Sequence, residues 1–162
     1  MYILNKTPIF LEFLKRFMDK AGYVFKDENI QNRLFLHSKC NCKQKDCATV
    51  YLKSIKPFKE ESTLINMFNT NKGYIIVHIL DDGFFEFEAL LYKKYPYKKE
   101  IDNFFNKNKK IDKKEPKIRT KVKKISDKNM KKIDDYFKDL EFLEPNIIDL
   151  GEIDFNEIKK KD

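Results

Sequence analysis

Gly73-Tyr-Ile-Ile-Val-His-Ile-Leu-Asp-Asp-Gly-Phe-Phe-Glu-Phe-Glu-Ala-Leu-Leu-Tyr92 is the stretch that decides the fold, because two runs of strand-forming residues flank Asp81-Asp82-Gly83. β-Branched and aromatic residues fill both runs, which is typical of strands. Gly83 is suited to the left-handed backbone conformation that a hairpin turn requires. The stretch therefore predicts an antiparallel β-hairpin.

The apolar pattern of the two runs also predicts their register. If Leu80 pairs with Phe84 across a three-residue loop, one face of the hairpin collects all the alternating apolar residues. These are Ile75, Val77, Ile79, Phe85, Phe87 and Ala89. A two-residue turn would place two of them opposite glutamates, so we expect the three-residue loop.

Helical periodicity appears on both sides of the hairpin. Thr7-Pro8 predicts the start of a first helix, with Thr7 as cap and Pro8 at the first position, and Ala21-Gly22 predicts its end. Its apolar face comprises Phe10, Leu11, Leu14, Phe17 and Met18. A short helix over residues 97–105 would turn Ile101, Phe104 and Phe105 inward. Asp127 would cap a last helix, whose stripe comprises Met130, Ile133, Tyr136, Phe137 and Leu140.

Two further strands, over about residues 31–36 and 48–53, would flank a short loop that contains every cysteine of the chain. The order of helix, hairpins and helices predicts an α+β fold, with a largely antiparallel sheet covered by the N-terminal helix and the C-terminal helices. A length of 162 residues with 41% hydrophobic content suits one core. We expect a single domain over residues 1–158, followed by a frayed tail at 159–162.

The net charge of +8 is concentrated in one segment. Residues 107–124 hold ten Lys or Arg and two acidic residues, and Pro116 interrupts any helix there, so we expect an extended crossing or a mobile loop. The favoured interpretation is a solvated lysine face. The alternative is a nucleic-acid surface that contacts phosphates through Lys109, Lys110, Lys113 and Lys114. With arginine at only three positions, bidentate reading of bases is not expected.

The loop His37-Ser-Lys-Cys40-Asn-Cys42-Lys-Gln-Lys-Asp-Cys47 is the chemically richest part of the chain. His37, Cys40, Cys42 and Cys47 form a candidate Cys3His set for structural zinc. C-x-C spacing requires a single loop to bend around the ion, so zinc is weighed against two alternatives. One is redox chemistry, which nearby lysines would favour by lowering thiol pKa values. The other, which we favour, is a turn holding reduced cysteines.

Three features of the sequence predict a cytoplasmic protein. No apolar run reaches the about 20 residues that span a bilayer, and no basic region precedes an apolar stretch at the N-terminus as in a secretory signal. Three cysteines within one loop fit a reducing compartment better than a disulfide framework.

Catalytic motifs are absent from the sequence. There is no phosphate-binding loop, dinucleotide fingerprint or hydrolase elbow, and no catalytic-zinc pattern accompanies the cysteines. His78 would face Glu86 across the hairpin, with Glu88 diagonal, and we interpret this as a solvated cross-strand pair rather than an acid–base site. We therefore expect a protein that is not an enzyme.

Four segments together resemble small uncharacterised bacterial immunity proteins of polymorphic or contact-dependent toxin systems. They are Cys40-Asn-Cys42-x4-Cys47-Ala-Thr-Val-Tyr-Leu, Ile76-Val-His-Ile-Leu-Asp-Asp-Gly, Phe85-Glu-Phe-Glu-Ala-Leu and Tyr95-Pro-Tyr-Lys-Lys-Glu-Ile. The resemblance implies a non-enzymatic cytoplasmic binding protein that neutralises a toxin by occlusion. Because this chain is basic, an acidic protein partner fits best, and no membrane partner is expected. The alternative function is nucleic-acid association through the lysine-rich segment, with structural zinc at the cysteine loop.

Overall fold

The computed structural model describes residues 2–25, 34–54, 64–80, 84–92, 94–108, 123–149 and 158–160. Its larger sheet contains β1 (Tyr2–Ile3), β3 (Leu34–Lys39), β4 (Val50–Ser54), β5 (Leu64–Thr70), β6 (Gly73–Ile79), β7 (Phe84–Leu90) and β8 (Phe142–Asp149). A smaller sheet pairs β2 (Tyr23–Phe25) with β9 (Ile158–Lys160). The helical elements are the 3-10 turn η1 (Leu4–Lys6) and the helices α1 (Pro8–Lys20), α3 (Lys98–Lys107) and α4 (Asp127–Lys138).

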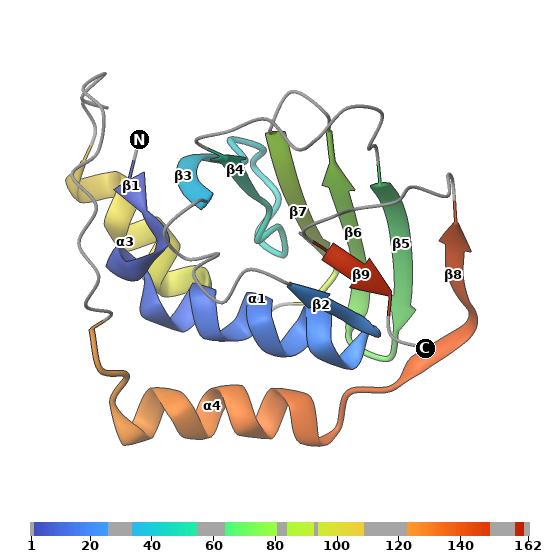
Figure 1. The fold of residues 1–162 in the computed structure, drawn as a ribbon. Coiled ribbons are helices and arrows are strands. Elements are labelled where there is room, and N and C mark those ends of the chain that lie inside the picture. The colour runs from blue at the N-terminus through green and yellow to red at the C-terminus, as the bar shows by residue number, and fades with distance from the viewer. Residues whose placement is uncertain are drawn as a thin grey trace.

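The seven strands of the larger sheet follow the order β1-β3-β4-β7-β6-β5-β8, and each pairing between neighbours is antiparallel. Helix α1 lies across one face of this sheet, and α4 runs beside α1 on the side away from it (Figure 1). This arrangement confirms the predicted α+β class with an antiparallel sheet. None of the described helices is long and apolar enough to cross a membrane.

The predicted register of the central hairpin is confirmed. Val77 pairs with Phe87, and the amide of Leu80 donates a hydrogen bond to the Phe84 carbonyl at 2.8 Å. All six residues predicted to share the apolar face are fully buried. Each is 0% exposed: Ile75, Val77, Ile79, Phe85, Phe87 and Ala89. The Asp81–Gly83 turn itself lies outside the described residues.

Three phenylalanines of α1 pack against one phenylalanine of the sheet. The ring centroids of Phe10, Phe13 and Phe17 lie 6.1, 6.2 and 5.5 Å from that of Phe87, each in an edge-on orientation. All four side chains are fully buried. Burying a side chain of this size stabilises a fold by about 1.5–3 kcal/mol, so this contact is a major part of the core.

The start of α1 is capped differently from the sequence prediction. Pro8 occupies the first helical position as expected, but the Thr7 hydroxyl donates to the Leu4 carbonyl at 3.3 Å and caps nothing. The free amides of Ile9 and Phe10 instead donate to the carboxylate of Glu100 on α3, at 3.2 and 2.9 Å. Burial raises the pKa of Glu100 to about 7, although the two amide hydrogen bonds oppose the rise.

Helix α4 begins one residue away from the predicted cap. Ser126 is the N-cap, and its hydroxyl accepts a hydrogen bond from the Asn129 amide at 3.3 Å, whereas Asp127 is the first helical residue. Serine fits the cap because its short side chain reaches back to the first turn, and Asp127 interacts favourably with the helix dipole there. Of the predicted stripe, Ile133, Tyr136 and Leu140 are buried.

Five of the described strands were not among the sequence predictions: β1, β2, β5, β8 and β9. Strand β9 includes Lys159 and Lys160, which pair with Val24 and Tyr23, so these two residues of the predicted frayed tail belong to a sheet. Of the predicted lysine-rich segment 107–124, the structure describes residues 107, 108, 123 and 124.

Two glycines provide a matched test of backbone strain. Gly22 and Gly73 both have positive φ angles, +92° and +121°, but a Cβ at Gly22 would meet no atom within 4 Å, whereas one at Gly73 would lie 2.3 Å from the Leu90 carbonyl oxygen. We expect Gly22→Ala to lower the free energy of unfolding by about 1 kcal/mol, and Gly73→Ala to lower it by clearly more. Urea denaturation measures both, and equal losses would contradict the predicted clash.

The Glu100 carboxyl predicts a pH dependence of stability. Its folded-state pKa of about 7 lies above the ordinary glutamate value of 4.5, so its contribution is fully present below pH 4.5 and is lost as the pH rises through 7. Between pH 5 and 8, the wild type should lose about 2–3 kcal/mol of unfolding free energy relative to Glu100→Gln. Urea denaturation of both proteins at the two pH values measures this difference. Parallel losses in the two proteins would show that Glu100 does not titrate in this range.

Candidate metal centre

The cysteine loop connects β3 to β4 and is fixed by backbone hydrogen bonds at both ends. The Cys40 amide donates to the Thr49 carbonyl at 3.1 Å, which closes the loop at its base. The Ala48 amide donates to the Ala89 carbonyl of β7 at 2.9 Å, and the Thr49 hydroxyl accepts from the Ala89 amide at 3.2 Å. The base of the loop is therefore attached to the central strand β7.

Helix α3 holds the same loop from the other side. The buried Tyr97 hydroxyl donates to the Ala48 carbonyl, and the Lys98 ammonium donates to the Cys47 carbonyl, both at 2.8 Å. Asp102 accepts from Lys39 of β3 at 2.7 Å and lies 3.4 Å from Lys98. Although burial opposes the change, the hydrogen bond and charge of these two lysines lower the pKa of Asp102. No sequence pattern predicts these supports, because Tyr97, Lys98 and Asp102 follow the loop by some fifty residues and match no motif.

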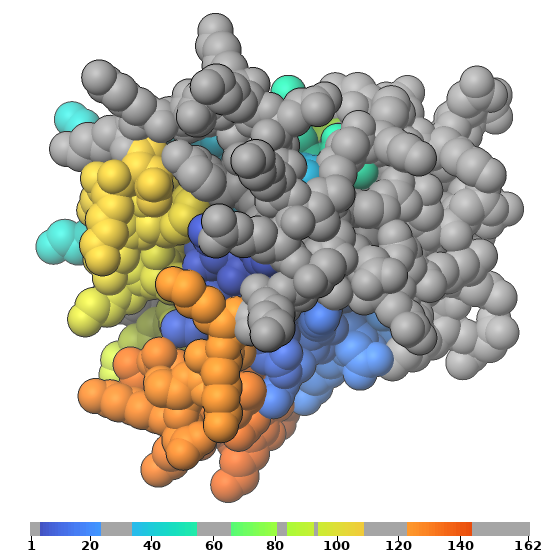
Figure 2. All heavy atoms as spheres, turned by 60° about the vertical axis from the view of Figure 1, so that its left-hand side comes forward, coloured from blue at the N-terminus to red at the C-terminus, as the bar shows by residue number. Residues whose placement is uncertain are grey.

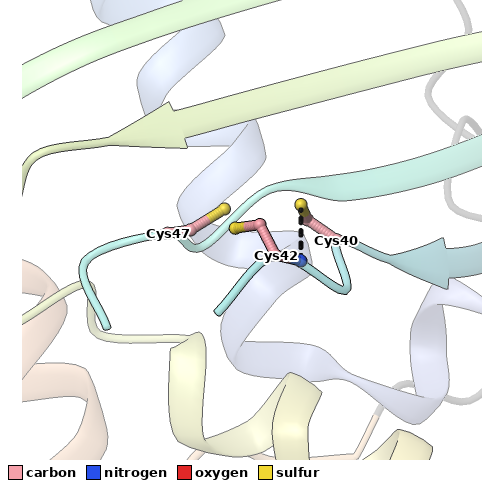
Figure 3. A group of neighbouring side chains, drawn as sticks. All are labelled: Cys40, Cys42 and Cys47. Carbon is pink, nitrogen blue, oxygen red and sulfur yellow. Dashed lines mark hydrogen bonds between the residues drawn. The ribbon is translucent and has the colours of Figure 1, made fainter. Parts of the chain in front are cut away.

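The loop brings the three thiols together. The Sγ atoms of Cys40, Cys42 and Cys47 all lie within 4.8 Å of one another, and Figure 3 shows the sulfur atoms of Cys42 and Cys47 pointing toward each other with that of Cys40 nearby. In a tetrahedral zinc site with Zn–S bonds of about 2.3 Å, the sulfur atoms are about 3.8 Å apart. Small side-chain adjustments would therefore bring these thiols to zinc-binding distance.

Exposure of the thiols increases from the base of the loop to its tip. Cys47 is buried, Cys40 is half-buried and Cys42 is exposed, and all three are free thiols. A metal ion held by them would have protein on one side and solvent on the other. The arrangement therefore offers three protein ligands and one position for water or for a fourth group.

Local hydrogen bonding separates the acidities of the thiols. The Cys42 amide donates to the Cys40 sulfur at 3.4 Å, and this backbone hydrogen bond, helped by the side chains of Cys42, Cys47 and Tyr51, lowers the pKa of Cys40. A hydrogen bond from the Gln44 backbone lowers the pKa of Cys42, but the two neighbouring thiols outweigh it, so the pKa of Cys42 is raised. Cys40 is thus deprotonated more readily than Cys42 to accept a metal, since the thiolate is the ligand.

His37 is not part of the thiol group. It belongs to β3 at a register irregularity between Leu36 and Ser38, and its ring lies edge-on to Phe84 at 6.3 Å between centroids. Burial and the charge of Lys53 lower the pKa of His37. The structure thus brings together three of the four ligands predicted from the sequence, and it places the histidine on the sheet instead.

A second group of possible metal donors lies on the central hairpin. One ligand atom each of His78, Glu86 and Glu88 lies within 4.8 Å of the others, and the His78 Nε2 atom is 3.8 Å from the Glu88 carboxylate. His78 and Glu86 are paired across β6 and β7, as predicted. Burial and the neighbouring Glu88 raise the pKa of Glu86 to about 7, and burial and Glu86 raise that of Tyr51 to about 12.

The alternative nucleic-acid residues, Lys109, Lys110, Lys113 and Lys114, all lie outside the described residues.

Comparisons with known proteins leave the cysteine geometry as the main evidence on function. The chain matches no family model, no curated protein and no solved structure.

Proposed function

We propose that this chain is a zinc-binding protein, in which the thiolates of Cys40, Cys42 and Cys47 hold the ion and thereby order the β3–β4 loop for binding a partner. The observation that carries the proposal is the convergence of three sulfur atoms to within 4.8 Å on a loop attached to both the sheet and α3. Soft thiolate ligands select Zn²⁺ over hard cations such as Mg²⁺ and Ca²⁺.

The charge of the surroundings supports this proposal. Three thiolates around one Zn²⁺ leave a net negative charge, which is costly beside a buried core unless cations lie nearby. Lys98 donates to the carbonyl of Cys47, and Lys39 directly precedes Cys40, so two ammonium groups are available next to the thiols. The nearby Asp102 links the two lysines and fixes their positions.

Single cysteine replacements test the site. We expect one Zn²⁺ per chain in wild-type protein, and we expect Cys42→Ser to weaken zinc binding by more than the roughly 10–100-fold that the loss of a supporting residue costs. Because Cys42 is exposed, this change should leave the folded metal-free protein intact. Elemental analysis gives the stoichiometry, and competition with a chromogenic chelator gives the affinity.

His37→Ala is the matched control. It removes the residue that the sequence places in the same ligand set but that the structure places against Phe84, so zinc affinity should be unchanged.

Thiol titration separates the remaining alternatives for the cysteine loop. Thiols that a chelator releases indicate a metal, whereas thiols that only a reductant releases indicate a disulfide. Three thiols that still react freely after one equivalent of Zn²⁺ has been added to the wild-type protein would reject the proposal.

We further propose that the partner is an acidic protein, as expected for an immunity protein that neutralises a toxin in the cytoplasm by occlusion without catalysis. Lys43 and Lys45 at the exposed tip of the loop support this proposal, because charge complementarity guides association and orients partners. A nucleic-acid partner that contacts the lysine-rich segment is the alternative.

The charge of the loop tip provides the test of a protein partner. With the product of the neighbouring gene as the candidate toxin, Lys43→Glu combined with Lys45→Glu should reduce the association rate by at least about tenfold at low salt. Lys131→Glu, on the exposed face of α4, is the control and should change it much less. Surface plasmon resonance measures both rates. Equal effects of the two charge reversals would remove the loop from the interface.

A further inference from the structure

A cavity of about 460 Å³ lies between α4, the segment that leads into α3, and the turn between β5 and β6. It is distinct from the thiol loop, since the two sites have no lining residue in common. Figure 2 shows α3 in yellow and α4 in orange on the same side of the molecule. Its volume lies in the range of about 300–1,000 Å³ that is typical of small-molecule sites.

Three tyrosines form an aromatic wall of the cavity. The ring of Tyr92 lies edge-on to those of Tyr95 and Tyr136, with centroids 5.4 Å away in both cases. Packing against the core fixes this wall, because Tyr136 also contacts the buried Phe13 with centroids 4.9 Å apart. Tyr95 and Tyr136 are each 3% exposed and hold the half-buried Tyr92 in place, so Tyr92 supplies most of the rigid aromatic surface that a planar ring can reach.

One lysine is held against the tyrosine wall. The Lys72 ammonium lies 4.7 Å from the centroid of the Tyr136 ring and 5.6 Å from that of Tyr92, and it donates to the Tyr136 carbonyl at 2.9 Å. These contacts use one of its three donor hydrogens and place a positive charge at the cavity. The ammonium is therefore already positioned to bind an anion.

The hydroxyl of Tyr136 is a buried polar group without a partner among the described residues. Tyr136 is 3% exposed, and its hydroxyl makes no hydrogen bond there. The adjacent tyrosines differ, because Tyr95 donates to the Leu90 carbonyl and Tyr97 to the Ala48 carbonyl. A buried hydroxyl is rarely left unsatisfied, so a ligand in the cavity that Tyr136 lines is a natural partner.

The rim of the cavity is mainly positive. Lys94, Lys99 and Lys132 join Lys72 in lining it, against two aspartates, Asp135 and Asp139. Lysine binds phosphate as a point charge with three donors, and so requires no fixed planar geometry. Aromatic wall and lysine rim together match a ligand that carries both a planar ring and a phosphate.

We propose that this cavity binds a nucleotide unit, with the base against the tyrosine wall and the phosphate at the lysine rim. The same chemistry is present in a free mononucleotide and in one nucleotide of a single strand. The site is independent of the zinc site, and its test can fail without affecting that proposal.

Isothermal titration calorimetry with AMP tests the site. Adenosine, which lacks the phosphate, and inorganic phosphate, which lacks the ring, are the ligand controls. We expect AMP to bind at least tenfold more tightly than either, because only AMP uses both the wall and the rim. A ten-residue oligoadenylate RNA distinguishes the two sources. Similar affinity for AMP and the RNA indicates a free nucleotide, whereas much tighter binding of the RNA that weakens steeply with salt indicates a strand.

Variants assign binding to the cavity. Lys99→Ala and Lys132→Ala should each weaken binding of the preferred ligand about five- to tenfold, and Lys131→Ala, an exposed neighbour that does not line the cavity, should leave it unchanged. Tyr136→Phe should weaken binding without lowering the unfolding midpoint, because the hydroxyl has no partner in the described part of the free protein. If AMP and the RNA both fail to bind at 1 mM, or if binding is the same in the lysine variants and the control, the proposal is wrong.

Discussion

The packing of three α1 phenylalanines on Phe87 is the interaction on which the rest of the structure depends. It fixes α1 against the centre of the sheet, where β7 lies between β4 and β6. The N-terminal amides of α1 then require a partner, and Glu100 supplies it from α3. Tyr97, Lys98 and Asp102, all within three residues of that carboxylate, support the cysteine loop through hydrogen bonds to Ala48, Cys47 and Lys39. A contact in the core is thus connected to the thiols through only one helix.

This connection explains why the loop can present three thiols without any regular structure of its own. Residues 40–49 contain no helix or strand, so an ordered thiol group there needs support from outside the loop. Tyr97 and Lys98 bind the carbonyls of Ala48 and Cys47, and Ala89 of β7 binds the base of the loop. The exposed tip that remains is free to change with metal or partner, whereas the base is fixed by the core.

The sequence predicted those elements in which a local pattern and the final packing agree. The register of the hairpin followed from the requirement to keep glutamates off the buried face, and the three helices followed from their apolar spacing. Strand β5 was not predicted because Asn66 occupies a position where an apolar residue is expected. The Asn66 side chain is buried and donates to the Tyr23 hydroxyl. Strand β8 contains Pro145, which is tolerated because β8 is an edge strand. In the site, the three cysteines were candidates because they lie in one short loop, but the exclusion of His37 depends on a strand irregularity that leaves no local signal.

The central claim is that three thiolates of one loop bind a single zinc ion. X-ray absorption spectroscopy at the zinc edge tests it most directly, because it counts the sulfur ligands. The account predicts three sulfur atoms at about 2.3 Å and one oxygen or nitrogen at about 2.0–2.1 Å. A first shell of oxygen and nitrogen alone would contradict it, since the zinc would then be bound elsewhere on the chain.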